Sequence, residues 1–444
     1  MTQAWRKRLL WLAQARSPAS AVAHTLVARL GVLAVNVATG VIVARTLQPA
    51  GRGEQSAMTI WPVVFCGIFT AGIPVALRYY VARSPERAAR LLSTALVYGV
   101  VLGLLACACG AAFIPYWLSK YDPHVVRFAQ WLMVIAPATM VAYVLQGYLE
   151  ARGDFRQANF IVYVPPVTTL VTLVVLVASH RMSPYSSSLA YLVPPVILTV
   201  WRTIAARASI RFPIKDFFEN SHALFSYGMR AFGIDLLSTL SLQVDQALVA
   251  KFLIAADLGV YTVALTISRL LNTVSSSLNI VLFPKASSLE QDAALALVAR
   301  GARLTLAATG SAAVVLALVV PWLLPIVYGP LFASSARIAQ VLLIEVTIGS
   351  TVIVLAQAFL STGRPGVVTA LQGVGLLATV PLMLVCIPKF GLLGAAVALL
   401  GSTTLRLLFV LASYPLLLKR LPPSLLLTAD DVRFVFMKLR RAND

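Results

Sequence analysis

Val43-Ala44-Arg45-Thr46-Leu47 recurs in this sequence as Val249-Ala250-Lys251-Phe252-Leu253, at an offset of 206 residues. The same offset places Gly53 on Gly259, so the match continues beyond the quoted residues. A repeat of this length indicates two related halves, and an element in the first half predicts its counterpart in the second.

The chain around this repeat is strongly apolar. Hydrophobic residues make up 59% of its 444 positions and charged residues 12%, whereas soluble domains carry about 25% charged residues. Lys and Arg number 36 against 16 Asp and Glu, a formal net charge of +20. A soluble nucleic-acid binder would carry such charge on a polar surface, which this composition does not provide. The composition excludes a soluble enzyme and a disordered chain, and predicts a polytopic membrane protein.

Twelve stretches are long and apolar enough to cross a bilayer as helices, since a span needs about 20 residues. They run near 24–46, 56–82, 91–114, 126–149, 157–178, 186–206, 224–250, 256–284, 296–323, 336–360, 366–388 and 392–416. Gln146–Leu149 on the fourth stretch matches Gln357–Leu360 on the tenth, as the first matches the seventh. Six spans therefore separate the copies, and both halves share one orientation.

These observations predict an all-α integral membrane protein in which two six-helix bundles surround a central cleft, an architecture typical of transporters. The expected segments are a cytoplasmic segment 1–23, an N-terminal bundle 24–206, a cytoplasmic linker 207–223, a C-terminal bundle 224–416 and a cytoplasmic interfacial tail 417–444.

The Lys and Arg residues predict the orientation of the spans. They gather in the even-numbered connections and at both ends of the chain. We therefore expect a protein of the cell inner membrane with both termini on the cytoplasmic side. Much of the positive charge then reflects topology. In the tail, Val432, Val435, Phe436 and Leu439 form an apolar stripe among basic residues, which predicts a short helix on anionic lipid.

Five short motifs follow one another in the second half. They are Gln243-Val244-Asp245, Leu258–Ala264, Val281–Pro284, Val327–Phe332 and Pro388–Ala396. In this order they resemble the Q-x-D, LGxYxxA, lfP, lyGxxF and PkfGixGAA motifs of Wzx-like polysaccharide flippases. The sequence is thus similar to the multidrug/oligosaccharidyl-lipid/polysaccharide exporter (MOP) superfamily along nearly its whole length.

The resemblance implies a V-shaped pair of six-helix bundles that works by alternating access, with the first, second, seventh and eighth helices lining the cleft. The implied cargo is an undecaprenyl-diphosphate-linked oligosaccharide, moved from the cytoplasmic to the outer leaflet for surface polysaccharide biosynthesis. Membrane lipids, and a glycan polymerase or export-complex proteins, are the partners it suggests, and nucleic acid is not among them. No cofactor is expected, although H+ or Na+ could couple to transport.

Ionisable residues at bilayer depth cost about 2.5–3.5 kcal/mol on insertion scales, so they mark functional or paired positions. A guanidinium pairs bidentately with phosphate oxygens, which makes deep arginines candidates for a diphosphate. The candidate cargo-binding residues are Arg29, Arg269, Arg78 and Arg230, with Asn36 and Gln243 for sugar hydroxyls, and the candidate coupling or gating carboxylates are Asp235 and Asp245.

Alternative roles remain open for these side chains. Arg29 could pair with Asp235, and Glu345 with Arg406, as purely structural contacts. Arg78 and Arg230 could extend to the interface. The scattered His and Cys residues give no metal-ligand spacing, so no metal site is predicted.

Three other functions compete with a lipid-linked sugar flippase. A drug or organic-cation antiporter of the same fold would need an acidic cleft, which deep arginines oppose. A glycan polymerase or ligase would need a large loop with a nucleophile and base, and the connections are too short for one. A non-transporting scaffold subunit of a glycan export complex is an alternative that the sequence does not exclude. The sequence therefore predicts a transporter and no enzyme.

Overall fold

The computed structural model describes residues 18–206, 216–272, 289–428 and 430–431. Helices form all of the regular structure in these residues, as the sequence predicts. The first half comprises α2 (Pro18–Phe69), α3 (Ile73–Arg83), η1 (Pro85–Arg87), α4 (Ala88–Trp117), α5 (Pro123–Leu132), η2 (Met133–Ile135), α6 (Ala136–Ala151), α7 (Phe155–Ala178) and α8 (Pro184–Ala205). The second comprises α9 (Phe217–Phe252), α10 (Ala255–Arg269), α12 (Gln291–Tyr328), η4 (Pro330–Phe332), α13 (Ser335–Ser361), α14 (Pro365–Ser413) and η5 (Tyr414–Leu418).

Within the described residues, all twelve predicted spans coincide with helices, although their boundaries follow backbone breaks. The long helix α2 holds the first span and part of the second, divided at Gln48, whose φ is 59°. Ala71 and Gly72, with φ of 48° and 68°, separate α2 from α3, which begins at Ile73. In α14, Gly391 with φ of 58° divides the last two spans. The eighth span, predicted to reach 284, is described only to residue 272.

Not every span is apolar enough to be recognised by hydropathy alone. Eight helical stretches of the described residues meet the length and composition expected of a membrane crossing, and two of them each hold a pair of predicted spans or parts of them. The helix α9 is not among them, and its sequence contains the charged residues Arg230, Asp235 and Asp245. The protein is therefore a multi-pass membrane protein in which α9 carries unusual polarity.

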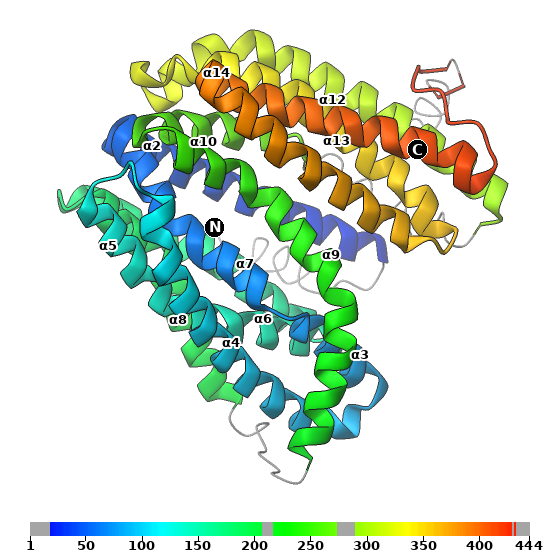
Figure 1. Cartoon of the computed structure of the whole chain (residues 1–444), viewed down its shortest axis with the longest axis horizontal. Coiled ribbons are helices and arrows are strands. Elements are labelled where there is room, and N and C mark those ends of the chain that lie inside the picture. Colours follow the sequence, from blue (N-terminus) through cyan, green and yellow to red (C-terminus); the bar gives the residue numbers. More distant parts are fainter. Residues whose placement is uncertain (1–17, 207–215, 273–288, 429, 432–444) are drawn as a thin grey trace, which may run out of the picture.

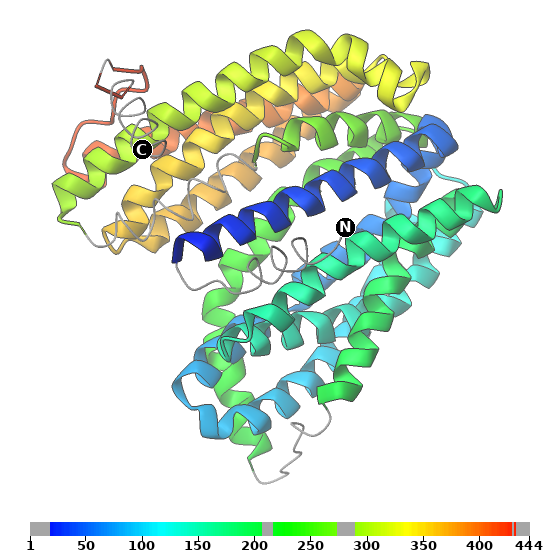
Figure 2. The same ribbon diagram turned by 180° about the vertical axis from the view of Figure 1, so that it is seen from behind.

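The two halves converge at one end and diverge toward the other (Figures 1 and 2). At the converging end α2 packs on α10 through glycine. A Cβ on Gly53 would lie 1.6 Å from the Ala255 carbonyl oxygen, and one on Gly259 would lie 2.0 Å from that of Pro49. These two pairs of positions are related by the offset of the sequence repeat, so the contact is reciprocal, as a twofold relation between these segments requires. Small residues allow this backbone approach within lipid.

Hydrogen bonds between the halves reinforce the converging end. The indole Nε1 of Trp117 on α4 donates to the Ala247 carbonyl oxygen on α9 at 2.7 Å. Nearby, Nζ of Lys251 donates to the Tyr116 carbonyl oxygen at 2.6 Å and lies 4.1 Å from the centroid of the Tyr116 ring. Nε of Arg45 donates to the Val327 carbonyl oxygen at 2.7 Å. Basic side chains thus satisfy carbonyl groups freed at helix ends.

The helix α9 connects the two halves. Its first part packs on first-half helices: Gly228 meets the α2–α3 break, where a Cβ on Gly72 would lie 2.2 Å from the Gly228 carbonyl oxygen. Tyr227 stacks on Tyr79 of α3 with ring centroids 4.2 Å apart. Its second part pairs with α10 and α14. The predicted bundle boundary at 224 therefore falls in a helix that contacts both halves.

The tail residues that the structure describes bind α12 at the diverging end. The carboxylate of Asp431 is fully buried and accepts hydrogen bonds from Nε and Nη2 of Arg303 at 2.6 and 3.0 Å and from Nε of Arg300 at 3.2 Å. Thr428 donates through its amide and hydroxyl. The predicted tail stripe from Val432 to Leu439 lies outside the described residues.

We expect the docking of this tail to depend on pH through Asp431. Hydrogen bonds from Arg303 hold the pKa of this carboxyl well below its usual range. Because the folded-state pKa is lowered, the docked tail is stabilised above about pH 4 and loses that stabilisation as pH falls further. Asp431→Asn should raise hydrogen exchange of residues 419–428 at neutral pH and remove this acid dependence. Asp430→Asn, an exposed neighbour, is the control, and equal exchange in both variants would contradict the assignment.

Candidate functional site

A polar cavity of about 280 Å³ lies between the halves near the converging end. We call it the Arg52 cavity. Its walls come from α2, α8, α9 and α10, so three of the four helices expected at the cleft contribute segments to it. It is lined by Arg52, Gln55, Ser56, Thr59, Ile60, Val63, Tyr191, Gln243, Gln246, Thr262, Leu265, Thr266 and Arg269. Most of these side chains are hydroxyls, amides or guanidinium groups, which can bind a hydroxyl-rich or anionic molecule.

Arg269 belongs to a buried hydrogen-bonded cluster in one wall of this cavity. Its Nη2 lies 3.3 Å from Oδ2 of Asp245 and donates to the Leu242 carbonyl oxygen at 3.1 Å. The Tyr261 hydroxyl donates to the same carboxylate oxygen at 3.2 Å. The Asp245 side chain is 1% exposed and that of Arg269 is 35% exposed. Arg269 therefore compensates a buried carboxylate with one edge of its guanidinium and faces the cavity with the rest.

Arg52 supplies a positive charge that no carboxylate of the described residues pairs with. Its Nη1 donates to Oε1 of Gln55 at 2.6 Å, and its buried Nε has no hydrogen-bond partner in the part of the chain that the structure describes. Among the ion pairs of the described residues, Arg52 takes no part. With Asp245 and Arg269 offsetting one another, the described lining of the Arg52 cavity keeps a net positive charge.

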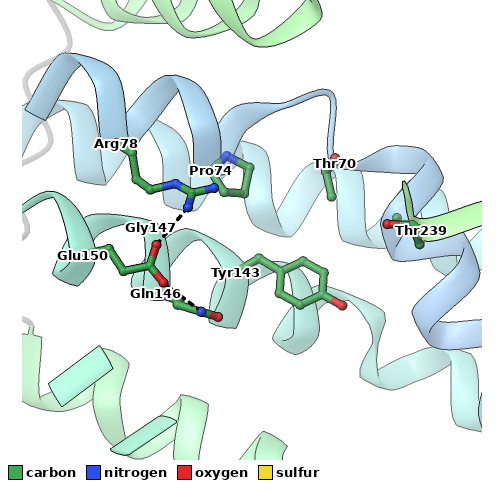
Figure 3. Close-up of a pocket in the computed structure, with 9 residues that line it drawn as sticks. Thr70, Pro74, Arg78, Tyr143, Gln146, Gly147, Glu150 and Thr239 are labelled. Atoms are coloured by element: carbon green, nitrogen blue, oxygen red, sulfur yellow. Dashed lines mark hydrogen bonds and ion pairs between the residues drawn. The ribbon is translucent and has the colours of Figure 1, made fainter. Parts of the chain in front are cut away.

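A second polar cavity, of about 250 Å³, lies further toward the diverging end (Figure 3). We call it the Arg78 cavity. Nη1 of Arg78 on α3 donates to Oε2 of Glu150 at 2.9 Å, and Nε2 of Gln146 donates to Oε1 of the same carboxylate at 2.9 Å. Figure 3 shows Tyr143 and Thr239 at the other end of this cavity. Arg78 is thus paired with a carboxylate of its own half.

The two cavities lie along the same groove between α2 and α9. The Arg52 cavity is lined by Val63 and Gln243, and the Arg78 cavity by Gly67 and Thr239, each four residues along the same helix. Residues four apart share a helix face. A Cβ on Gly67 would lie 2.4 Å from Cγ2 of Thr239, so the helices touch where the cavities adjoin.

Of the other predicted site residues, two have side chains outside the described residues, two line neither cavity and one lines the Arg52 cavity. Arg29 lies on α2 and Asp235 on α9, but both side chains are outside the described residues. Asn36 is exposed on α2 and lines neither cavity. Arg230 is exposed, with Nη2 3.5 Å from the Ser226 hydroxyl. Gln243 lines the Arg52 cavity, as its predicted role requires.

The sequence left open an ion pair between Glu345 and Arg406 as an alternative, and this direct contact is not formed in the described residues. Thr403 donates its hydroxyl to Oε1 of Glu345 at 2.6 Å, and Nη2 of Arg406 donates to Oε1 of Gln372 at 3.3 Å. No ion pair joins the two among the described residues. Each charged group instead makes a hydrogen bond to a neutral neighbour.

Arg52 and Glu150 line the two cavities and are candidate site residues that sequence reasoning misses. The sequence places Arg52 in the outer connection between the first two spans, because the second span is predicted to begin at residue 56. The helix instead resumes directly after Gln48, which places Arg52 on its first turns and in the cavity. The available signal is the repeat itself, since Gly53 next to Arg52 matches Gly259 on a predicted cleft helix.

We expect the two members of the Arg269–Asp245 pair to differ in their effect on stability. Arg269→Gln leaves a buried carboxylate uncompensated and should destabilise the protein by roughly 3 kcal/mol, the lower part of the range for broken buried pairs. Asp245→Asn keeps an acceptor for Tyr261 and leaves Arg269 partly hydrated, so it should cost about 1 kcal/mol or less. Thermal unfolding in detergent tests this order, and a reversed order would contradict the burial argument.

Among the described residues, no group of three or more His, Cys, Asp or Glu side chains could hold a metal ion. The candidate site is therefore built from guanidinium, amide and hydroxyl groups.

Known proteins share this architecture. The chain superposes on a structure described as lipid II flippase MurJ in its inward closed conformation with a TM-score of 0.75 and 14% identity, covering 89% of this chain and 87% of that one. An inward-facing multidrug resistance MATE family transporter of the MOP superfamily gives 0.69 and 13%, covering 86% and 96%. An outward-facing structure of such a transporter gives 0.56 and 14%, covering 88% and 93%.

Sequence comparison gives a family but no relative among the curated proteins. No curated protein sequence is significantly similar to the chain. Residues 42–337 match a family model described as polysaccharide biosynthesis protein. That match covers well over half of the 444 residues, and the fold is that of MOP-superfamily transporters and flippases. The chain belongs to the polysaccharide biosynthesis protein family and has the fold of the MOP superfamily.

Proposed function

We propose that this protein translocates an undecaprenyl-diphosphate-linked oligosaccharide from the cytoplasmic to the outer leaflet by alternating access. The observation that carries the proposal is the Arg52 cavity, where a guanidinium without a carboxylate partner among the described residues faces hydroxyl and amide side chains between the two halves. Membership of a polysaccharide biosynthesis family and a fold shared with a lipid II flippase support the same cargo class.

The chemistry of the cavity suits this cargo. A diphosphate cannot enter hydrocarbon bare, because the idealised cost of transferring such an ion is of order 20 kcal/mol. Arg52 and the exposed part of Arg269 replace water around it with charge-assisted hydrogen bonds. Gln55, Gln243 and Gln246 provide amides that can bind sugar hydroxyls. The prenyl chain is apolar and can remain in lipid.

The arrangement of the halves supports an inward-facing state. They converge at the end that holds Gly53 and Gly259 and diverge at the end that holds the tail (Figure 1). The distribution of Lys and Arg favours a cytoplasmic position for the diverging end. The greater similarity to the inward-facing than to the outward-facing MATE structure agrees with this orientation.

An organic-cation exporter is less compatible with the charges. Two carboxylates that the structure describes beside the cavities, Asp245 and Glu150, are each within 3.3 Å of a guanidinium nitrogen. Neither is available to a cationic cargo unless an arginine leaves, while Arg52 repels such a cargo from the cavity.

A reconstituted translocation assay tests the function. The substrate is a polyprenyl-diphosphate sugar with a fluorescent headgroup, and dithionite added outside the liposomes quenches the headgroups that it can reach. With the purified chain in the membrane, headgroups from both leaflets should be quenched. In empty liposomes, only those of the outer leaflet should be. A polyprenyl ether of the same sugar, which lacks the diphosphate, should not be moved. Transport of a cationic dye instead would favour the exporter, and no transport by the isolated chain would favour the scaffold role.

A further inference from the structure

A third cavity, of about 590 Å³, lies outside the groove between the halves. We call it the rim cavity. It is formed where α6 ends, α7 begins and α8 ends, so it lies at the end of three membrane spans. Its lining residues are Leu145, Tyr148, Leu149, Arg152, Gly153, Asp154, Gln157, Arg202, Ala205 and Ala206. The proposed transport step does not use it.

Two guanidinium groups in the rim cavity have no carboxylate partner among the described residues. Nη1 of Arg152 donates to the Tyr148 hydroxyl at 3.2 Å. Arg202 donates to the amide oxygen of Gln157, and its buried Nε has no hydrogen-bond partner within the described ranges. Neither arginine takes part in an ion pair within the part of the chain that the structure describes.

The carboxylate in this cavity forms no ion pair with either arginine among the described residues. Asp154 caps α7, where its side chain accepts hydrogen bonds from the backbone N–H of Gln157 at 3.1 Å and from Nε2 of Gln157 at 2.6 Å. Two positive charges and one negative charge leave the described lining of the cavity with a net positive charge. An anion with several acceptor oxygens is the ligand that this arrangement favours.

The aromatic neighbours of Arg202 locate the cavity at the membrane surface. The guanidinium carbon lies 4.7 Å from the centroid of the Phe160 ring and 5.2 Å from that of Trp201. These two side chains are 40% and 55% exposed, on the outer face of helices that span the membrane. Trp at this depth and basic residues at helix ends are typical of the headgroup region. The rings hold the guanidinium in place but leave its charge for a further partner.

From these contacts we propose that the rim cavity binds the phosphate headgroup of a membrane lipid, with Arg152 and Arg202 as its two cationic ligands. The acyl or prenyl chains of that lipid lie outside, along the exposed faces of α7 and α8. An anionic phospholipid and a polyprenyl diphosphate share the required chemistry. The site is separate from the Arg52 cavity, so it holds whether or not this chain transports a lipid-linked sugar.

Native mass spectrometry of the whole chain released from nanodiscs tests the proposal. The wild type should retain phosphatidylglycerol over phosphatidylcholine, and Arg152→Gln with Arg202→Gln should lower that retention about tenfold or more, as expected when charge-assisted hydrogen bonds are lost. Each single variant should give part of the loss. Arg202→Lys should retain more lipid than Arg202→Gln, because it keeps the charge and loses the planar fork. Arg181→Gln, an exposed position at the opposite end of α7 and α8, is the matched control.

The competing ligands distinguish the sources of phosphate. Polyprenyl diphosphate is added as a competitor to the wild type and to the double variant. If it displaces phosphatidylglycerol from the wild type alone, the prenyl lipid is a ligand of the same site. Inorganic phosphate should not displace either lipid at equal concentration, because it lacks the chains. Equal retention of phosphatidylglycerol by wild type and double variant, or equal retention of phosphatidylcholine by the wild type, would overturn the proposal.

Discussion

Gly53→Ala is expected to abolish translocation, because no side chain fits where α2 crosses α10. The added Cβ would lie 1.6 Å from the Ala255 carbonyl oxygen, and that oxygen belongs to backbone that cannot move as a side chain can. Overpacking in a close-packed interior costs about 1–3 kcal/mol, and a backbone clash lies at the upper end of that range. The substitution should separate the halves at the converging end and disfavour the conformation described above.

Accessibility of the Arg52 cavity measures this separation. In a background without the four free cysteines, Ser56→Cys on the cavity wall should react with a membrane-impermeant maleimide from the outer side only when Gly53→Ala is also present. Gly259→Ala should give the same phenotype, since its Cβ would lie 2.0 Å from the Pro49 carbonyl oxygen.

Gly31→Ala on the same helix is the control, because nothing lies within 4 Å of its Cβ position. Full transport by Gly53→Ala, with no labelling of the thiol introduced by Ser56→Cys, would show that the glycine contact does not close this end.

Arg52→Glu is expected to reduce translocation to the level of empty liposomes while the protein stays folded. The side chain makes one hydrogen bond, to Gln55, and no ion pair among the described residues, so its loss removes little from the fold. A hydrogen bond to a charged group contributes about 1.5–3 kcal/mol, so Arg52→Gln alone should weaken diphosphate binding roughly ten- to hundredfold. Glutamate adds repulsion to that loss, and Arg52→Lys should retain part of the activity.

The matched control is Arg337→Glu, which makes the same charge change at an exposed position of α13 that lines neither cavity. The headgroup assay gives the rate, and equilibrium binding of a polyprenyl diphosphate gives the affinity. If Arg52→Glu binds and moves the diphosphate cargo as Arg337→Glu does, the Arg52 cavity is not its binding site.

Local sequence predicted the parts of this protein that depend on one helix at a time. Apolar length gave the twelve spans, and the polarity of α9 was visible in Arg230, Asp235 and Asp245. The repeat also related Gly53 to Gly259, whose contact now joins the halves. These features follow from hydrophobic burial and from the offset between two copies, both of which a linear sequence records.

The pairing of charges could be determined only by the tertiary structure. Arg78 meets Glu150 across 72 positions, and Arg269 meets Asp245 on a neighbouring helix, whereas Arg52 has no carboxylate partner in the described part of the chain. A hydrogen bond forms only within about 3 Å, so its partner depends on how each helix is rotated and where it crosses the next. Helix periodicity fixes which residues share a face, but the packing of distant helices decides what that face meets.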